Sequence, residues 1–546
     1  MATLVLLLLF YLFHLQLDVL ALPASSDYNF SYMKSVYNAI DLPAKELYDY
    51  IVVGGGTAGC SLAATLSEKY SVLVLERGNV PAAYPQVLST NGTLYNLIQE
   101  DNGKTPAQRF RSEDGVANAR GRILGGSSMI NIGIYSRAED EFYRESGIPW
   151  DKDLVLKAYK WVEETIVFQY NLSAWQSIAK QALLEAGVVP DNGFNLNHIV
   201  GTKATGSTFD DKGRRHGAVE LLNRGELKNL QVAVEATVER IIISNKFPSK
   251  DSSLTAKGVK YSDSKGRTHH AFVRNKGEVI LSAGTIGSPQ LLLLSGVGPV
   301  PDLSSLQIPV VHHNPYVGKF MADNPRNNIN IVVPFALDPS LAQVVGITSE
   351  FNYIETLSYT LPFSFPIPFG LFPNAISPLN ASLATIVVKI QGPLSSGSLR
   401  LASSSEVRVS PIVRFNYFDN PIDLARCVKG VRKVGDVLKT KALKPFKTRD
   451  LQGRESFMFL GPRLPENQSD ESAMDKFCRA SVTTFWHYHG GCLVGKVVNG
   501  DLRVMGINGL RVVDGSIFNR SPGTNPQATI MMLGRYVGLK MLQERS

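Results

Sequence analysis

The sequence predicts an α/β fold built around a nucleotide-binding βαβ unit, and three observations support this. An apolar run at 50–53 leads directly into the turn Gly54-x-Gly56-x-x-Gly59. A second apolar run follows and ends at Glu76. One sheet would be assembled from discontinuous segments, because further strand-like runs lie at 231–238, 277–284 and 510–514.

The glycine turn and the acidic residue together indicate a dinucleotide site. Gly54, Gly56 and Gly59 permit a tight turn and bring backbone N–H groups close to a pyrophosphate, while the helix that follows directs its positive N-terminus at the anion. Glu76 ends the second strand at the spacing where a carboxylate accepts hydrogen bonds from a ribose diol. The pattern leaves open which dinucleotide is bound.

Length and composition predict a globular enzyme of at least two domains. The chain has 546 residues, 44% of them hydrophobic, and a net charge of +8 without a long basic run, which argues against nucleic-acid binding. No internal repeat or exposed heptad suggests assembly, so a monomer is the simplest expectation. We place the cofactor domain at 45–150, 200–320 and 480–546, and the substrate domain at 151–199 and 321–479.

The N-terminus resembles a secretory signal peptide. The apolar run from Leu4 to Phe13 is too short to span a membrane, and the small-residue site Val19-Leu20-Ala21 predicts a signal peptide at 1–21. Secretion to the extracellular space, cell wall or vacuole makes N-glycosylation sequons meaningful. These sequons start at Asn29, Asn91, Asn171, Asn380 and Asn467.

Four cysteines are too few for a disulfide scaffold in a chain of this length, but one bridge is plausible. Cys60 lies in the nucleotide-binding helix and Cys492 follows His489-Gly-Gly. Cys427 and Cys478 are therefore the better pair, and four buried thiols are the alternative.

A Pro- and Phe-rich run at 361–373 opposes helix formation and predicts an apolar loop. Such a loop either walls a substrate pocket or packs inside the protein.

Two further glycine-rich segments, 121–138 and 284–299, suit a backbone that passes close to a large flat ligand. Together with the βαβ unit, Asp514-Gly515 and Thr524-Asn-Pro-Gln527, the chain resembles the glucose-methanol-choline (GMC) oxidoreductase family over its whole mature length. The resemblance implies FAD, a small-molecule substrate and a substrate domain with an antiparallel sheet. It implies non-covalent FAD, because 122–130 contains no histidine for attachment.

The resemblance also implies which residues bind FAD. At the pyrophosphate and adenosine end it places Thr57, Ala58, Glu76, Arg77 and the backbone of Val238. Along the flavin it places Ile123, Ser127, Asn131, Ile132, Gly133 and Ile134. Near the isoalloxazine it places Trp486, Asp514, Gly515 and Gln527.

The segment 485–495 contains two histidines, His487 and His489, which strand alternation would put on one side. No carboxylate or thiolate pattern supports a metal site here. We expect His489 to be a core histidine bonded to backbone. For His487 the resemblance implies the family's general acid/base, and an imidazole that titrates near neutral pH suits that role.

Within the family, the chain is most similar to the plant (R)-mandelonitrile lyase branch, which implies cleavage of an aromatic cyanohydrin to an aldehyde and HCN with a non-redox flavin. Three positions depart from that branch. Asn525 replaces a second histidine, Phe485 replaces a tyrosine, and Ile354 takes the place of a substrate-contacting cysteine.

Because of these three departures, two other functions are also compatible with the sequence. Because Asn525 cannot titrate, the His487/Asn525 pair also fits an FAD-dependent alcohol oxidase or dehydrogenase. The third interpretation of the sequence is a flavin-containing glycoprotein without catalytic activity. In the lyase reading the substrate contacts are Ile354, Phe485 and Trp486, the catalytic residues are His487 and Asn525, and Arg535 or the flavin helps to set the electric field.

Overall fold

The computed structural model describes residues 30–42, 45–169, 171–245, 254–333, 335–360, 382–449 and 452–545. Several predicted features lie outside these ranges: the signal peptide at 1–21, the sequons at Asn29 and Asn380, and the run at 361–373. Within the described residues, no helix is both long and apolar enough to cross a membrane.

The first of two large sheets has nine strands in the order β1-β10-β3-β2-β13-β12-β11, with β28 paired to β13 and β27 paired to β12. Six strands run parallel: β1, β10, β3, β2, β13 and β28. Strand β12 is antiparallel to β13 and β11 but parallel to β27. The bounds are β1 Val36–Asn38, β2 Lys45–Val53, β3 Val72–Leu75, β10 Leu230–Val234, β11 Thr237–Asn245, β12 Leu254–Ser262, β13 Thr268–Leu281, β27 Ile507–Asn508 and β28 Leu510–Val512.

The strands predicted from the sequence therefore belong to one sheet, with one difference. The run at 231–238 forms two strands, β10 beside β3 and β11 at the far edge. Glu235 lies between them with a φ of 57°, a left-handed conformation that a continuous strand does not contain. The chain turns there, and β11 crosses to the other end of the sheet.

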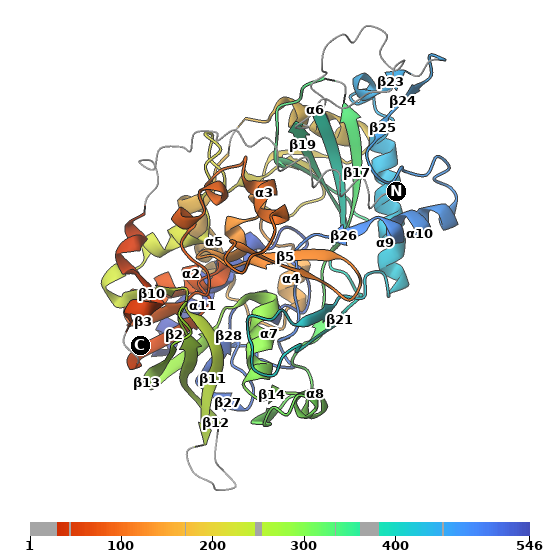
Figure 1. Ribbon diagram of the computed structural model, residues 1–546. Coiled ribbons are helices and arrows are strands. Elements are labelled where there is room, and N and C mark those ends of the chain that lie inside the picture. The colour runs from red at the N-terminus through yellow and green to blue at the C-terminus, as the bar shows by residue number, and fades with distance from the viewer. Residues whose placement is uncertain are drawn as a thin grey trace.

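Helices α2 (Thr57–Ser67) and α11 (Gln527–Arg545) pack against each other beside this sheet (Figure 1). Their axes approach closely because small residues line the contact. A Cβ on Gly534 would lie 2.2 Å from Ser61 Oγ, and a Cβ on Gly538 would lie 2.7 Å from Thr65 Cβ. The C-terminal helix is thus fitted to the nucleotide-binding helix by shape.

The second sheet has eight strands in the order β25-β17-β20-β19-β18-β8-β7, with β26 paired to β17. It is antiparallel except for the parallel pair β7 and β8. The bounds are β7 Asp191–Phe194, β8 Gly201–Ala204, β17 Pro325–Val333, β18 Val344–Ile347, β19 Asn352–Thr360, β20 Ser382–Ile390, β25 Met458–Phe459 and β26 Val482–Thr484.

Helices cover one face of this second sheet. They are α6 (Ala174–Glu185), α9 (Pro421–Leu438) and α10 (Glu471–Ala480), and they share an apolar core with inward residues such as Ile329, Ile354 and Val388. In Figure 1 these elements form the upper right part of the molecule, apart from the nucleotide-binding sheet. The opposite face of the sheet is not covered by these helices and borders the candidate active site.

Two elements pack with a different domain from the one in which the sequence places them. Helix α5 (Lys152–Ile166) falls in 151–199 but packs on α11 within the core of the nucleotide-binding sheet. Strand β8 falls in 200–320 but belongs to the antiparallel sheet.

Smaller elements connect the two sheets. The helices are α3 Thr93–Ile98, α4 Asp140–Glu145, α7 Gly284–Leu294 and α8 Val300–Ser305. The strands are β4 Ala107–Arg111, β5 Ala117–Gly121, β6 Ile134–Tyr135, β9 Gly206–Ser207, β14 Val297–Gly298, β15 His312–His313, β16 Lys319–Met321, β21 Gly397–Arg400, β22 Ile412–Arg414, β23 Thr448–Arg449 and β24 Glu455–Ser456.

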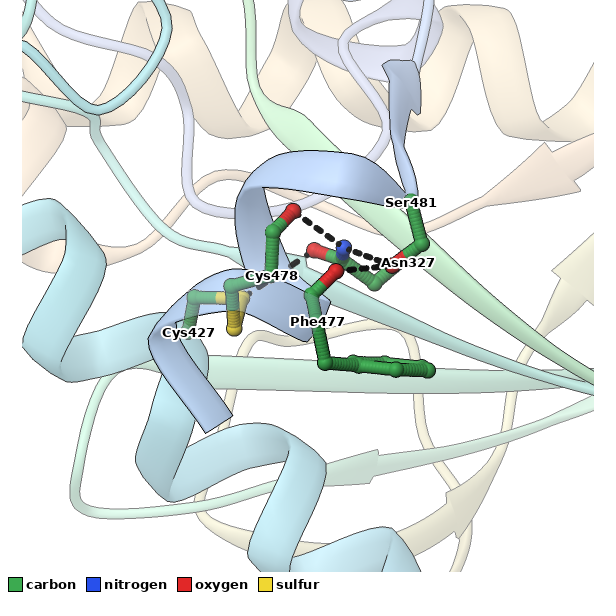
Figure 2. The surroundings of a disulfide bond; sticks show 5 residues. All are labelled: Asn327, Cys427, Phe477, Cys478 and Ser481. Atoms are coloured by element: carbon green, nitrogen blue, oxygen red, sulfur yellow. Dashed lines mark hydrogen bonds between the residues drawn. A yellow bond between two sulfur atoms is a disulfide. The ribbon is translucent and has the colours of Figure 1, made fainter. Parts of the chain in front are cut away.

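The predicted disulfide is confirmed. Cys427 of α9 is bonded to Cys478 of α10, and both are buried. Figure 2 shows Asn327 of β17 beside the bridge, where its Nδ2 donates to Cys478 O (2.9 Å) and Ser481 Oγ (2.8 Å). The bridge therefore fastens two helices to each other next to the sheet that they cover.

Candidate active site

A cavity of about 550 Å³ lies between the two sheets and contains the main predicted site residues. One end is lined by the glycine turn and Glu76. The other is lined by Phe485, His487 and the face of β17, β19 and β20 that the helices do not cover. The cavity is therefore long enough to bring a dinucleotide end and a substrate end into one continuous space.

Backbone atoms build the first end. Gly54 has a φ of 102°, and a Cβ there would lie 2.4 Å from Ser282 O. A Cβ on Gly59 would lie only 2.0 Å from Gly54 O, so this glycine holds α2 against the turn. No side chain caps α2 at Gly56, which leaves its first N–H groups free to meet an anion.

Glu76 closes this end with a buried carboxylate. Its Oε2 accepts from Gly55 N at 3.0 Å and its Oε1 accepts from Gly78 N at 2.7 Å. Burial raises the pKa of Glu76, and these backbone donors oppose the rise. The neighbouring Arg77 lines the cavity and donates to Gln108 Oε1 at 2.6 Å; burial lowers its pKa to about 10.

Side-chain hydrogen bonds position the middle of the cavity. Asn131 Nδ2 donates to Gln527 Oε1 at 2.9 Å, and Gln527 Nε2 donates to the backbone carbonyl of Ile134. Asp514 accepts from Gly284 N at 3.0 Å at the start of α7, and also from Ser288 Oγ. These bonds join the chain near 131 and 284 to its C-terminal segment.

Most of the cofactor-binding residues predicted from the glycine motif or from the resemblance line the cavity: Gly54, Gly56, Thr57, Ala58, Glu76, Arg77, Ser127, Asn131, Ile132, Val238, Trp486, Asp514, Gly515 and Gln527. Gly59, Ile123, Gly133 and Ile134 do not line it. Ile123 is fully buried in the core, and a Cβ on Gly133 would lie 2.5 Å from the Phe209 ring. These four residues pack behind the residues that form the cavity wall.

The histidine segment is held by Asp323, a buried residue just before β17. Asp323 Oδ2 accepts from Thr484 Oγ1 (2.6 Å) and Tyr417 Oη (2.5 Å), and Oδ1 accepts from His487 N (2.9 Å). Burial raises the pKa of Asp323 to about 6, against the effect of these donors. The backbone of His487 is thus fixed from a different segment of the chain.

His489 is the buried core histidine that the sequence predicts, whereas His487 does not keep the near-neutral pKa expected of it. His489 is buried, and its Nδ1 lies 3.2 Å from the backbone carbonyl of His487. His487 lines the cavity, and among the described residues its Nδ1 has no hydrogen-bond partner. Burial lowers the pKa of His487 well below its ordinary value, and Lys389, His489 and Arg326 lower it further. The imidazole is accordingly neutral, the form that accepts a proton.

Two basic residues, the buried Lys389 and the half-buried Arg326, lower the pKa of His487 through their charge. Burial lowers the pKa of Lys389 itself to about 7, against the effect of Glu355. Lys389 Nζ donates to Gly523 O at 2.9 Å and lies 4.4 Å from the Tyr353 ring centroid. The Arg326 guanidinium lies 4.6 Å from the Trp486 ring centroid. Arg535, the residue that we expected to help, instead contacts Glu68 and the Trp161 ring away from the cavity.

The prediction that Ile354 contacts the substrate is wrong. Side chains alternate along β19, so Ile354 packs in the core under the helices while Glu355, Leu357 and Tyr359 line the cavity. The predicted position differs by one residue from Glu355. A shift of one residue along a strand places the side chain on the opposite face of the sheet. Phe485 and Trp486 do line the cavity.

Three charged residues near this end were not predicted from the sequence: Arg326, Glu355 and Lys389. A signal for them exists: each is a charged residue in a strand that otherwise consists mostly of apolar or uncharged side chains. Such residues are costly to bury unless they serve a site. Without the register of the three strands, however, nothing in the sequence brings them together.

The cavity fits a large flavin dinucleotide. At its substrate end, three buried polar atoms have no hydrogen-bond partner within the described part of the chain: Trp486 Nε1, His487 Nδ1 and Asn525 Oδ1. At its other end are an uncapped helix N-terminus and a carboxylate. Buried polar atoms are rarely left unpaired, so their gathering around one cavity indicates a bound group.

Two family models described as GMC oxidoreductase match this chain, one at residues 48–326 and the other at 393–534. The chain belongs to the GMC oxidoreductase family. It is 57% identical to (R)-mandelonitrile lyase 2 of Prunus dulcis, with 100% of this chain and 96% of that protein covered. It is 58% identical to (R)-mandelonitrile lyase 1 of Prunus serotina, with 99% and 95% covered.

The fold is also that of solved structures of low sequence identity. Formate oxidase, with 20% identity, superposes with a TM-score of 0.74 over 92% of this chain and 99% of that one. This likeness confirms the arrangement of the two sheets.

Proposed function

We propose that the protein is an FAD-containing hydroxynitrile lyase that cleaves aromatic cyanohydrins of the (R)-mandelonitrile type to an aldehyde and HCN. The observation that carries this function is the identity of 57% and 58% to two (R)-mandelonitrile lyases over essentially the whole chain. The cavity adds a neutral, buried histidine whose pKa is lowered by the buried Lys389 and the half-buried Arg326, which suits acid–base cleavage.

FAD is the cofactor of this enzyme. The glycine turn, the N-terminus of α2 and Glu76 are suited to its adenosine diphosphate half, and Asn131, Trp486 and Gln527 to its flavin half. FAD, when bound, supplies the isoalloxazine ring system, which takes up no electrons in a lyase reaction. We expect non-covalent binding.

The chemical role of His487 is to take the proton of the cyanohydrin hydroxyl group. Loss of this proton lets the carbonyl double bond form while the bond to cyanide breaks. Lys389 and Arg326 place positive charge near the end of the cavity where cyanide is released, and they hold His487 in its neutral form.

The direct test measures cyanide release and the flavin spectrum in the same experiment. Holoprotein mixed anaerobically with (R)-mandelonitrile should release cyanide while the flavin absorbance stays that of the oxidised form. Absence of cyanide above the uncatalysed rate would overturn the lyase function. Bleaching of the flavin by benzyl or long-chain alcohols would indicate alcohol oxidation with His487 and Asn525 instead.

We also propose that the protein enters the secretory pathway, is N-glycosylated and acts as a monomer. The apolar run at Leu4–Phe13 and the disulfide support secretion. Asn91, Asn171 and Asn467 are the sequons within the described residues, and all three side chains belong to exposed residues. Enzymatic deglycosylation followed by mass spectrometry, and light scattering on the eluted protein, test these proposals.

A further inference from the structure

Glu355 is a buried carboxyl group for which the lyase reaction described above gives no role. It lies in β19, is only 1% exposed, and lines the cavity together with His487 and Asn525. Within the described ranges, its Oε1 has no hydrogen-bond partner. Because buried carboxyl oxygens are ordinarily paired, an unpaired one in a ligand cavity indicates a group that meets a ligand.

Asn525 lies next to this carboxyl group. The Asn525 side chain hydrogen-bonds to Glu355, and its own Oδ1 has no partner among the described residues. Asparagine can orient a hydroxyl group but cannot exchange a proton. Glu355 therefore brings a titratable group to the position where Asn525 lacks one.

The charged and titratable groups that face Glu355 come from four segments. They are Lys389 of β20, Arg326 of β17, Tyr353 and Tyr359 of β19, and the hydrogen-bonding Asn525. Burial raises the pKa of Glu355, while Lys389, Asn525 and Arg326 oppose the rise. The net direction is upward, so the carboxyl group retains a proton at a pH where a solvent-exposed glutamate has lost it.

We propose that Glu355 is the second proton-exchanging residue of this active site and that it protonates the cyanide that leaves. The proposal rests on the lyase function proposed above. It assigns two residues to two proton transfers: His487 accepts the first proton and Glu355 donates the second.

The reaction balances with these two residues. The hydroxyl O–H bond breaks and its proton passes to His487, the carbonyl π bond forms, and the electron pair of the breaking C–C bond leaves with cyanide. The Glu355 carboxyl O–H bond then breaks as its proton passes to the cyanide carbon, which gives HCN. Solvent exchange returns one proton to Glu355 and takes one from His487, so no co-reactant is needed.

The first experiment replaces the carboxyl group by a group of the same shape. Glu355→Gln should lower kcat for cyanohydrin cleavage about 100-fold, the usual contribution of a positioned acid, while the flavin content stays unchanged. Glu355→Asp should retain part of the activity. The matched control is Glu350→Gln, an exposed glutamate 3.4 Å from Lys429 on the surface, which should behave like the unaltered protein.

The second experiment asks whether a titratable group at position 525 restores the function. Adding Asn525→His to Glu355→Gln should recover at least about tenfold in kcat, because the imidazole supplies the missing proton exchange. If Glu355→Gln fails to fold because Lys389 loses the nearby carboxyl group, Glu355→Gln combined with Lys389→Met removes both titratable groups and serves as the background.

Infrared difference spectra of the holoprotein between mildly acidic and alkaline pH give a readout that does not depend on turnover. A protonated-carboxyl band that disappears on alkalisation in the unaltered protein and is missing in Glu355→Gln would confirm that this residue titrates. Identical bands in both proteins would overturn the proposal.

The cyanide assay separates the two levels of failure. No cyanide from the unaltered protein means that the lyase function itself is wrong. Cyanide release at the same kcat from the unaltered protein and from Glu355→Gln means that the lyase function stands and that Glu355 is not its second acid.

Discussion

The two ends of the cavity are built in different ways. The nucleotide end consists mostly of main-chain groups, namely a glycine turn and the first N–H groups of α2, together with the Glu76 carboxylate directly after β3. The substrate end consists of side chains from separate segments, including Arg326, Glu355, His487 and Asn525. The first end has a geometry that one short motif specifies, and the second exists only after distant strands have paired.

This difference predicts two kinds of mutational effect. Changes in the turn should remove the cofactor, because no other conformation of the backbone presents the same donors. Changes at the substrate end should leave the cofactor bound and alter rates or pH dependence. A third region, the helix-covered face of the antiparallel sheet, should affect stability alone.

The largest effect is expected from Gly59→Ala. The new Cβ would lie 2.0 Å from Gly54 O, so α2 and the turn cannot keep their present contact. We expect purified protein with no more than a trace of flavin, measured by the ratio of flavin to protein absorbance. Gly187→Ala is the control: alanine is strained at the φ of 82° there, but its Cβ meets nothing within 4 Å, so stability should fall while the flavin content stays normal. Normal flavin content in Gly59→Ala would contradict the main-chain account.

The next effect is expected from His487→Ala. Removing the base should lower kcat for cyanohydrin cleavage about 10³-fold, within the range of general acid–base catalysis. Flavin content should remain normal, since Trp486, Gln527 and the turn are unchanged. The measurements are initial rates and flavin absorbance. A rate within a few fold of the unaltered protein would show that another residue takes the hydroxyl proton.

A smaller effect, on stability only, is expected from replacing both Cys427 and Cys478 by alanine. The bridge closes a loop with a sequence separation of 51 residues. Loss of such a constraint lowers the free energy of unfolding by about 2–4 kcal/mol. Thermal and denaturant unfolding measure this change. The specific activity at low temperature should be unchanged, because the bridge lies on the helix-covered face; a large loss would show that the two faces are coupled.

The smallest effect is a shift in pH dependence caused by Lys389→Met. Lys389 is the leading charged group that lowers the pKa of His487, after burial. Removing this cation raises the His487 pKa, so protonation of the base begins at a higher pH. The acidic limb of the kcat/KM profile should therefore move upward by about one pH unit. An unmoved or downward-shifted limb would contradict the assigned field.

The sequence alone predicts the nucleotide end almost completely. The glycine motif, Glu76 and the apolar strands are short-range patterns whose physical meaning does not depend on the rest of the fold. The bridge between Cys427 and Cys478 was also predictable, because the other two cysteines lie in segments with another role. The membership of the runs at 277–284 and 510–514 in the same sheet as 50–53 follows from the same local patterns.

The substrate end was predicted only in part. His487, Trp486 and Phe485 lie in one recognisable segment, and all three line the cavity. Ile354 was misplaced because a shift of one residue in a strand exchanges the two faces, and no local pattern in 352–360 states which face is covered by helices. The same missing register concealed Glu355 and its neighbours. The split of 231–238 was missed because a single left-handed residue interrupts an otherwise strand-like run.

The C-terminal segment described above also bears on how the protein is made. Strand β28 pairs with β13, α11 packs on α2, and Gln527 hydrogen-bonds to Asn131. A nascent chain lacks these partners until residues 510–545 have been translated. We therefore expect firm binding of FAD only once this segment has been made, and a chain truncated before α11 to lack the cofactor and to be bound by chaperones.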